Sequence, residues 1–203
     1  GVVQALPFIL QKITTVPLEL PPIEVSGKRG WVLGAGDTAM DCLRAAIRYG
    51  AREAVCVYRR DEADMPCGLR EYENAREEGA RFVFQAAPVS VLGNEQRRVT
   101  GLRLVHTELG LMESIGPRPF LIRPDTEFEM EADLIVLALG FDPQPCPHSG
   151  DFADLAVNDW GGLIVDANQM TSIPAVFAGG DIVRGPSLVL HAVRDARRAA
   201  AGI

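Results

Sequence analysis

The sequence contains no long apolar run. No stretch reaches the roughly 20 apolar residues of a membrane-spanning helix, and residues 1–10 carry neither the charged start nor the cleavage site of a secretory signal. Net positive charge is also absent, because 27 acidic residues outnumber 20 lysines and arginines and give a net charge of −7 and a pI of about 5.0. Such an acidic protein does not offer a broad surface to nucleic acid or anionic membranes. We therefore expect a cytoplasmic protein with no nucleic-acid or membrane partner.

Metal-binding and redox-active spacings are missing too. The four cysteines include no C-x-x-C pair, and the three histidines have no metal-ligand spacing among them. Scattered thiols fit a reducing compartment and suit neither an iron–sulfur cluster nor a redox-active dithiol. We predict no metal site, and we expect buried or incidental thiols and structural or surface histidines at Cys42, Cys56, Cys67, Cys146, His106, His148 and His191.

The first residues lack an initiator methionine and have apolar side chains near helical spacing, which predicts a helix over 1–13. We therefore expect an excerpt from a longer protein. Prolines predict an extended connector over 14–29. From residue 30 the strands and helices alternate in the β–α–β pattern of a parallel sheet. Strands are predicted at 30–34, 54–58 and 81–85, and helices at 38–49 and 69–78.

A different pattern follows the third of these strands. Alternating residues over 99–107 and further strands near Phe120 and Phe128 predict an antiparallel meander. Residues 133–140 form a continuous apolar run, which is typical of a strand buried on both faces. After a proline-rich segment the sequence predicts short strands near 163–165 and 175–178 and a final helix over 186–200.

A glycine-rich turn, G-A-G-D-T-A, joins the first strand of the alternating region to its helix. Gly34 permits the tight turn, Gly36 lets the main chain approach a diphosphate, and the small Ala39 allows close packing of helix on strand. Amides at the helix start, at Asp37 and Thr38, can hold phosphate at the positive end of the helix dipole. A purely structural turn is the alternative, but the flanking strands and helix favour a Rossmann-like dinucleotide-binding domain.

Two arginines follow the second strand, at the position that distinguishes NAD from NADP. An NAD site places a carboxylate there, whereas the guanidinium groups of Arg59 and Arg60 suit the 2′-phosphate of NADPH. The alternative is a solvated basic turn, neutralised by Asp61 and Glu62. The spacing favours NADPH, with lesser candidate ligands on the next helix at Arg70 and Arg76.

A second glycine motif, Gly-Gly-Asp, ends an apolar segment at Asp181. It places a carboxylate at the carboxyl edge of a predicted strand, where α/β sheets bind ligands. A turn that merely ends the strand is the alternative.

Five segments of the sequence resemble one family, and they occur in the same order over nearly the whole chain. Together they resemble the small subunit of glutamate synthase, within the pyridine nucleotide-disulfide oxidoreductase superfamily, and the flavin half of dihydropyrimidine dehydrogenase is similar. The segments are Val32–Cys42, Tyr58–Pro66, Asn74–Gly79, Ala138–Gly140 and Phe177–Ile182.

The resemblance implies an α/β fold with two nucleotide-binding domains. A three-layer NADPH domain with an antiparallel meander, residues 29–142, would be inserted into an FAD domain. Residues 1–28 would be the end of the first FAD-domain segment and a linker, and residues 143–203 the C-terminal FAD-domain segment.

The resemblance also implies the residues that contact the cofactors. Gly140 matches a glycine near the bound nicotinamide nucleotide. Gly180 and Asp181 match the flavin-binding motif, in which the aspartate bonds the ribityl chain. The helix that begins near Ser187 would point its N-terminus at the isoalloxazine.

The implied enzyme is an NADPH-dependent FAD oxidoreductase of the glutamate synthase small-chain type. It would pass hydride from NADPH to FAD and then electrons through iron–sulfur clusters to a glutamine-processing large subunit. Because the cofactors carry this chemistry, we predict no catalytic side chain. Helix capping and solvation account for the two carboxylates nearest the turn, Asp37 and Asp41.

Two parts of the family pattern are missing from the sequence. These are an earlier G-x-G-x-x-G loop for the FAD phosphates and the N-terminal cysteines that ligate the iron–sulfur clusters. We therefore expect a fragment that is inactive alone, has an incomplete FAD site, needs the missing N-terminal region, and forms a homodimer through uncovered apolar surface. The alternatives are another NADPH:acceptor oxidoreductase of the superfamily, a non-catalytic NADPH-binding module, or an α/β domain that binds no nucleotide.

Overall fold

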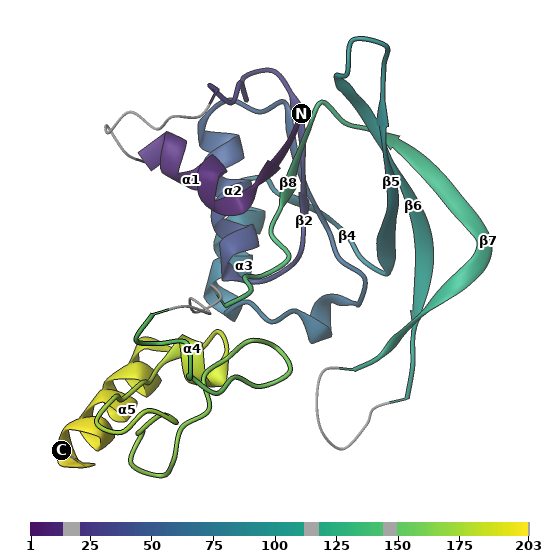
Figure 1. Ribbon diagram of the computed structural model, residues 1–203. Helices are drawn as coiled ribbons and strands as arrows, with labels where there is room; N and C mark the ends of the chain where they lie inside the picture. Colours follow the sequence, from purple (N-terminus) through teal and green to yellow (C-terminus); the bar gives the residue numbers. More distant parts are fainter. Residues whose placement is uncertain (14–20, 112–117, 144–149, 203) are drawn as a thin grey trace. The chain divides into compact units, whose positions relative to one another are not determined.

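The computed structural model describes residues 1–13, 21–111, 118–143 and 150–202 (Figure 1). Contacts divide the chain into two units, Gly1–Gly140 and Phe141–Ile203. No helix in the described ranges is long and apolar enough to cross a bilayer. Cys146 and His148 lie outside these ranges, as does the first part of the expected connector, residues 14–20.

A five-stranded parallel sheet forms the centre of the first unit, as the alternating pattern predicts. The strand order is β1-β8-β2-β3-β4, and every neighbouring pair is parallel. The order places β8, which comes last in the chain, between β1 and β2. The strands are β1 (Val2–Gln4), β2 (Arg29–Leu33), β3 (Glu53–Val57), β4 (Arg81–Val83) and β8 (Leu134–Leu137).

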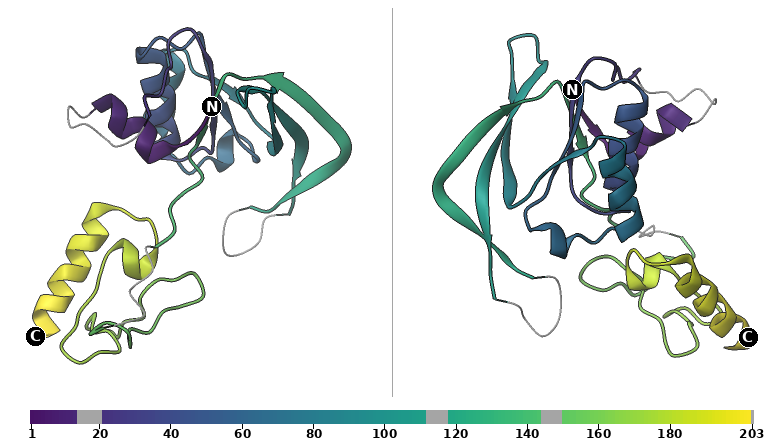
Figure 2. Two further views of the ribbon diagram at one scale, coloured as in Figure 1. Left: turned by 45° about the horizontal axis from the view of Figure 1, so that its top comes forward. Right: turned by 180° about the vertical axis from the view of Figure 1, so that it is seen from behind.

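Three helices cover one face of this sheet in all views (Figures 1 and 2). They are α1 (Ala5–Ile13), α2 (Asp37–Arg48) and α3 (Leu69–Glu77). Helical spacing gathers the apolar residues of α2 on its inner side, and these join the sheet residues that point the same way in one core cluster. The fully buried members of this cluster include Phe8, Val32, Met40, Cys42, Leu43, Cys56 and Val136.

An antiparallel sheet covers the other face, so the unit has three layers (Figure 2). Its strands, in the order β5-β6-β7, are β5 (Ala86–Gly93), β6 (Val99–Leu109) and β7 (Phe120–Glu131). Strand residues alternate between faces, and therefore Trp31 and Leu33 of β2 join a second core cluster with Leu102 and Leu104 of β6. The predicted α/β fold with a meander is confirmed.

The meander differs from its prediction in two places. The strands expected near Phe120 and Phe128 are one strand, β7, whose alternation is broken by Asp125 at φ +57° and by a register shift between Val105 and Thr107 on its partner. The sequence did not predict β5, an edge strand that contains Pro88 and is exposed along most of its length.

The start of the chain differs from the expected helix over 1–13. Val2–Gln4 form β1, which pairs with β8, and the helix begins only at Ala5. Phe8 of α1 is fully buried in the same core as α2. Contacts place residues 1–13 in the same compact unit as residues 29–140.

The second unit has little regular structure apart from its helices, α4 (Asp181–Arg184) and α5 (Val189–Gly202). The strands expected near 163–165 and 175–178 do not form in its described part, which has only the isolated bridges Val157–Leu163 and Met170–Phe177. The final helix forms, with its start shifted to Val189 because a separate turn, α4, precedes it.

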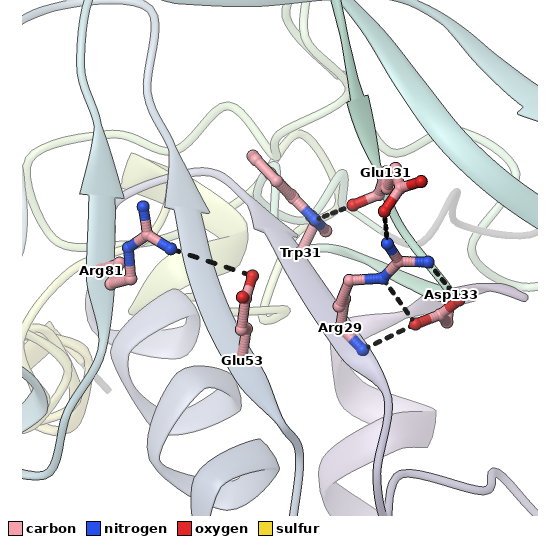
Figure 3. A network of polar contacts seen from close by, with 6 residues as sticks. All are labelled: Arg29, Trp31, Glu53, Arg81, Glu131 and Asp133. Carbon is pink, nitrogen blue, oxygen red and sulfur yellow. Dashed lines mark hydrogen bonds and ion pairs between the residues drawn. The ribbon is translucent and has the colours of Figure 1, made fainter.

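A charged network at the start of β2 ties the two sheets of the first unit together (Figure 3). The Arg29 guanidinium donates to both carboxylate oxygens of Asp133, at 3.0 and 3.1 Å, and also pairs with Glu131. The indole of Trp31 donates to the main-chain oxygen of Glu131 at 3.0 Å. Because Glu131 ends β7 and Asp133 precedes β8, these contacts fix the point where the chain leaves one sheet for the other.

We expect the Arg29–Asp133 pair to make a pH-dependent contribution to the stability of the fold. Hydrogen bonding from Arg29 lowers the pKa of Asp133 to about 2, below the value of about 3.9 in an unfolded chain. The pair therefore stabilises the fold above about pH 4 and loses this effect as the pH falls toward 2. Since a third of the Asp133 side chain is exposed, Asp133→Asn should lower the free energy of unfolding by about 1 kcal/mol at pH 7.

Urea unfolding of the parent and Asp133→Asn at pH 7 and pH 2.5 measures this contribution. The difference between the two proteins should shrink at the lower pH. The control is Glu95→Gln, an exposed acid in the β5–β6 hairpin for which the described residues show no ion pair. A difference that is the same at both pH values would contradict the assignment.

Candidate nucleotide-binding site

The predicted glycine-rich turn lies between the carboxyl end of β2 and the first residue of α2. Gly34 adopts φ +120°, and a Cβ atom there would lie 2.2 Å from the main-chain oxygen of Ala138. Only glycine fits this position, because both the backbone angle and the close approach exclude a side chain. Gly36 is different, since it has an extended conformation and an added Cβ would meet nothing within 4 Å.

Four consecutive main-chain amides at this turn have no acceptor among the described residues, those of Ala35, Gly36, Asp37 and Thr38. The helical hydrogen bonds begin at Ala39, whose amide donates to the Gly36 oxygen at 2.9 Å. Free amides at the N-terminus of a helix carry the positive end of its dipole and form an anion site. The open space at Gly36 leaves room for a diphosphate at these amides.

The Asp37 carboxylate accepts a hydrogen bond from the main chain of another segment of this protein. Its Oδ1 accepts a hydrogen bond of 2.8 Å from the amide of Gly68, which precedes α3. Its side chain therefore fastens the start of α3 to the turn, and its contribution to a phosphate site is the main-chain amide. Asp41, one helical turn further, has a raised pKa, mainly because of burial.

Ion pairs connect α2 with α3. Arg44 bonds to Glu71 at 2.9 Å and to Glu78 at 2.8 Å, and Arg48 bonds to Glu78 at 2.6 Å. Hydrogen bonds from Arg48 and Arg44 lower the pKa of the Glu78 carboxyl. These pairs connect side chains far apart in sequence, which sequence reasoning missed.

Arg59 and Arg60 follow β3 directly, as predicted, but their environments differ. Arg60 is only 9% exposed; its Nε donates to the main-chain oxygen of Arg118, and one of its terminal nitrogens lies 3.3 Å from the Tyr58 hydroxyl. Arg59 is exposed, and its guanidinium lies 4.8 Å from the ring centre of Phe120. Among the described residues, no hydrogen bond or ion pair of the Arg59 guanidinium is present, and so its donors are available to a phosphate.

The lesser arginine candidates lie on α3. Arg76 lies 5.5 Å from the ring centre of Tyr72, on its own helix, and Arg70 is exposed in the first turn. Gly140, the other residue matched to the nicotinamide nucleotide, has φ +107° and is exposed at the end of the first unit.

The second unit presents the Gly-Gly-Asp motif as a turn into α4. Gly180 has φ +76°, and the exposed Asp181 accepts from the Ser187 amide at 3.2 Å. Ser187 in turn lies 2.6 Å from the Nδ1 atom of His191. These contacts bring the predicted residues Asp181 and Ser187 together around one turn.

A buried carboxylate that sequence reasoning missed supports this turn. Asp195 of α5 is fully buried, accepts from the Gly180 amide at 3.1 Å and pairs with Arg184 through both its oxygens. Hydrogen bonding from Arg184 and Gly180 lowers the pKa of Asp195. An Asp and an Arg at this separation have no local signature, so nothing in the sequence marked the pair.

The thiols have no metal-binding arrangement in the described part of the chain. Burial raises the pKa of Cys42 and of Cys56 to about 12, and it also raises that of Cys67. No group of three or more potential metal ligands is found among the described residues. Thiols with raised pKa values are poor nucleophiles.

A parallel sheet with an open glycine turn at a helix start is the arrangement typical of dinucleotide-binding domains. Comparison with known proteins gives the family. Residues 9–196 match the family model described as pyridine nucleotide-disulphide oxidoreductase, and the chain belongs to that family.

Two curated relatives and one solved structure are informative. The chain is 47% identical to the glutamate synthase [NADPH] small chain of Azospirillum brasilense, over 89% of this chain and 37% of that protein. It is 35% identical to the NADPH-Fe(3+) oxidoreductase subunit beta of Geobacter sulfurreducens, over 86% of this chain and 29% of that protein. The chain thus spans less than half the length of these relatives.

The solved structure is thioredoxin reductase of Lactococcus lactis. The TM-score is 0.71 at 19% identity, and the match covers all of this chain and 56% of that one. This similarity confirms the fold.

We expect opposite outcomes from an alanine substitution at Gly36 and at Gly34. Gly36→Ala should leave the free energy of unfolding within about 1 kcal/mol of the parent, because the conformation suits alanine and the space is open. Nucleotide affinity should fall at least about tenfold, because the methyl group would occupy the space that we expect a diphosphate to fill. Gly34→Ala should instead cost at least about 3 kcal/mol of stability.

Thermal unfolding and fluorescence titration with NADPH measure both effects. A Gly36→Ala protein that folds and binds NADPH as the parent does would show that the turn holds no diphosphate.

Proposed function

We propose that this chain binds NADPH as the electron donor of a flavin-dependent oxidoreductase of the glutamate synthase small-chain type. The observation that carries the proposal is the open turn at Gly36, where four main-chain amides have no acceptor among the described residues. Family membership and the identity to a glutamate synthase small chain support the same donor.

The nucleotide is held by charge and by main-chain donors. The amides from Ala35 to Thr38 bind the diphosphate, and Gly34 and Ala39 shape the turn that presents them. Arg59 bonds the 2′-phosphate with its free guanidinium donors. Arg60, which is tied to Arg118 and Tyr58, adds positive charge at that position but has fewer donors to offer.

The second unit is proposed as the C-terminal segment of an FAD domain. Asp181 would bond the ribityl chain, with Gly180 and Ser187 shaping the turn beside it and Gly140 lying near the nicotinamide nucleotide. When both cofactors are bound, the nicotinamide supplies a hydride that the flavin accepts. The residues of this chain bind and orient the two partners, and no side chain acts as acid, base or nucleophile.

The electron acceptor beyond the flavin is part of the proposal. Iron–sulfur clusters in a further N-terminal region and a glutamate synthase large subunit suit the small-chain relatives. The Fe(3+) oxidoreductase subunit at 35% identity favours a second candidate, reduction of another acceptor. In the full-length protein, NADPH oxidation that depends on glutamine and the large subunit would support the first, and Fe(3+)-dependent oxidation without them the second.

Removal of Arg59 tests the choice of NADPH. Arg59→Ala should weaken NADPH binding by about 30-fold, the loss of a charge-assisted pair of bonds, and leave NADH binding within about twofold of the parent. Arg60→Ala should lower the melting temperature as well as the NADPH preference, because it removes a buried guanidinium. Isothermal titration with both nucleotides measures the ratio of affinities.

Arg52→Ala provides the matched control, because this exposed arginine precedes β3 at the opposite end from Arg59. It should bind both nucleotides as the parent does. Equal affinity of the parent for NADPH and NADH would refute the assignment of the 2′-phosphate to Arg59.

A further inference from the structure

Both arginines after β3 lie against one aromatic ring from the antiparallel sheet. The Arg59 guanidinium carbon is 4.8 Å from the centre of the Phe120 ring, and that of Arg60 is 5.9 Å away. Phe120 is the first residue of β7. A cation within about 6 Å of an aromatic face is attracted to it, and therefore β7 restricts side chains that β3 supplies.

Hydrogen bonds that involve Thr107 of the antiparallel sheet also hold the main chain of the two arginines. The buried Thr107 of β6 donates its hydroxyl proton to the Arg59 oxygen at 2.7 Å, and its amide donates to the Gln85 oxygen at 2.8 Å. The Gln85 amide in turn donates to the Arg60 oxygen at 2.9 Å. These bonds fix the direction in which the chain leaves β3.

The contacts give the two arginines unequal freedom. Arg60 uses its Nε on the Arg118 oxygen and lies near the Tyr58 hydroxyl, whereas the contact of Arg59 is the ring of Phe120. Among the described residues, the Arg59 guanidinium has no hydrogen-bond or ion-pair partner that would occupy its donors. Phe120 thus leaves the hydrogen-bonding edge of Arg59 available.

We propose that Phe120 and Thr107 are positioning residues for the 2′-phosphate, so that the antiparallel sheet determines the preference for NADPH over NADH. This inference rests on the proposed function. Side chains held in a binding geometry lose less freedom when the ligand arrives, which raises affinity without a new contact to it. Phe120 and Thr107 act through Arg59.

The test is titration of the full chain with NADPH and NADH after Phe120→Leu, which removes the ring and keeps apolar bulk. NADPH affinity should fall about fivefold, and NADH affinity should stay unchanged. Phe120→Tyr should restore the parent ratio, because it keeps the aromatic face. The matched control is Phe128→Leu on the same strand, whose ring stacks on His106 at 4.6 Å instead of on the arginines.

Thr107→Val provides a second, independent variant. It keeps the shape of the side chain, removes the hydroxyl donor to the Arg59 oxygen, and should also lower the ratio of NADPH to NADH affinity. Circular dichroism confirms that each variant is folded. If Phe120→Leu does not fold, Thr107→Val decides the result.

The outcomes distinguish a failure of this inference from a failure of the proposed function on which it rests. A parent that prefers NADPH, with Phe120→Leu and Thr107→Val keeping the parent ratio, would overturn the inference and leave the proposed function standing. Equal weakening of both nucleotides would show a merely structural role and also overturn it. A parent that binds neither nucleotide would overturn both.

Discussion

The close approach of two main chains at the carboxyl end of the parallel sheet is the constraint on which the proposed nucleotide site depends. The Ala138 amide donates to the Leu33 oxygen at 2.9 Å, and the Gly34 amide donates to the Val57 oxygen at 3.1 Å. These are the last ladder bonds of β2, and a side chain at Gly34 would collide with Ala138. The chain must turn there. The main-chain amides that follow, from Ala35 to Thr38, therefore have no partner in the sheet and lie at the start of α2.

The two faces of the parallel sheet serve different purposes. On the helical face, α2 contributes small and aliphatic side chains such as Ala39, Leu43 and Ala46 to the core, so that it lies close enough to present its first amides at the sheet edge. The opposite face packs on the antiparallel sheet through Trp31, whose indole also bonds to β7. That sheet in turn contacts the residues immediately after β3. The proposed diphosphate end and the proposed 2′-phosphate end of the site are therefore supported by different layers.

The sequence was sufficient for features that depend on local patterns. Alternating strands and helices, the glycine turn and the arginines after β3 are all read from neighbouring residues, and the structure has them. β1 was missed because three residues are too short to show a period, and their apolar side chains continued the spacing of α1. β5 was missed because Pro88 and its exposed face weaken a strand signal.

The contacts of the site could not be read in the same way. The partner of Arg60 is Arg118, 58 residues along the chain, and the carboxylate that holds Gly180 is 15 residues away at Asp195. Such pairs depend on how the layers pack. The sequence thus identified Arg59 and Arg60 as equivalent candidates, and only the packing separates the exposed guanidinium from the buried one.

An NMR titration tests the central claim most directly, since it observes the amides of the turn themselves. In ¹H–¹⁵N spectra of the chain, NADP⁺ and NAD⁺ should both shift the amides of Ala35, Gly36, Asp37 and Thr38, because both nucleotides carry the diphosphate. The Arg59 side-chain N–H should shift with NADP⁺ alone. Amides of the turn that stay unmoved while a different region responds to both nucleotides would contradict the account.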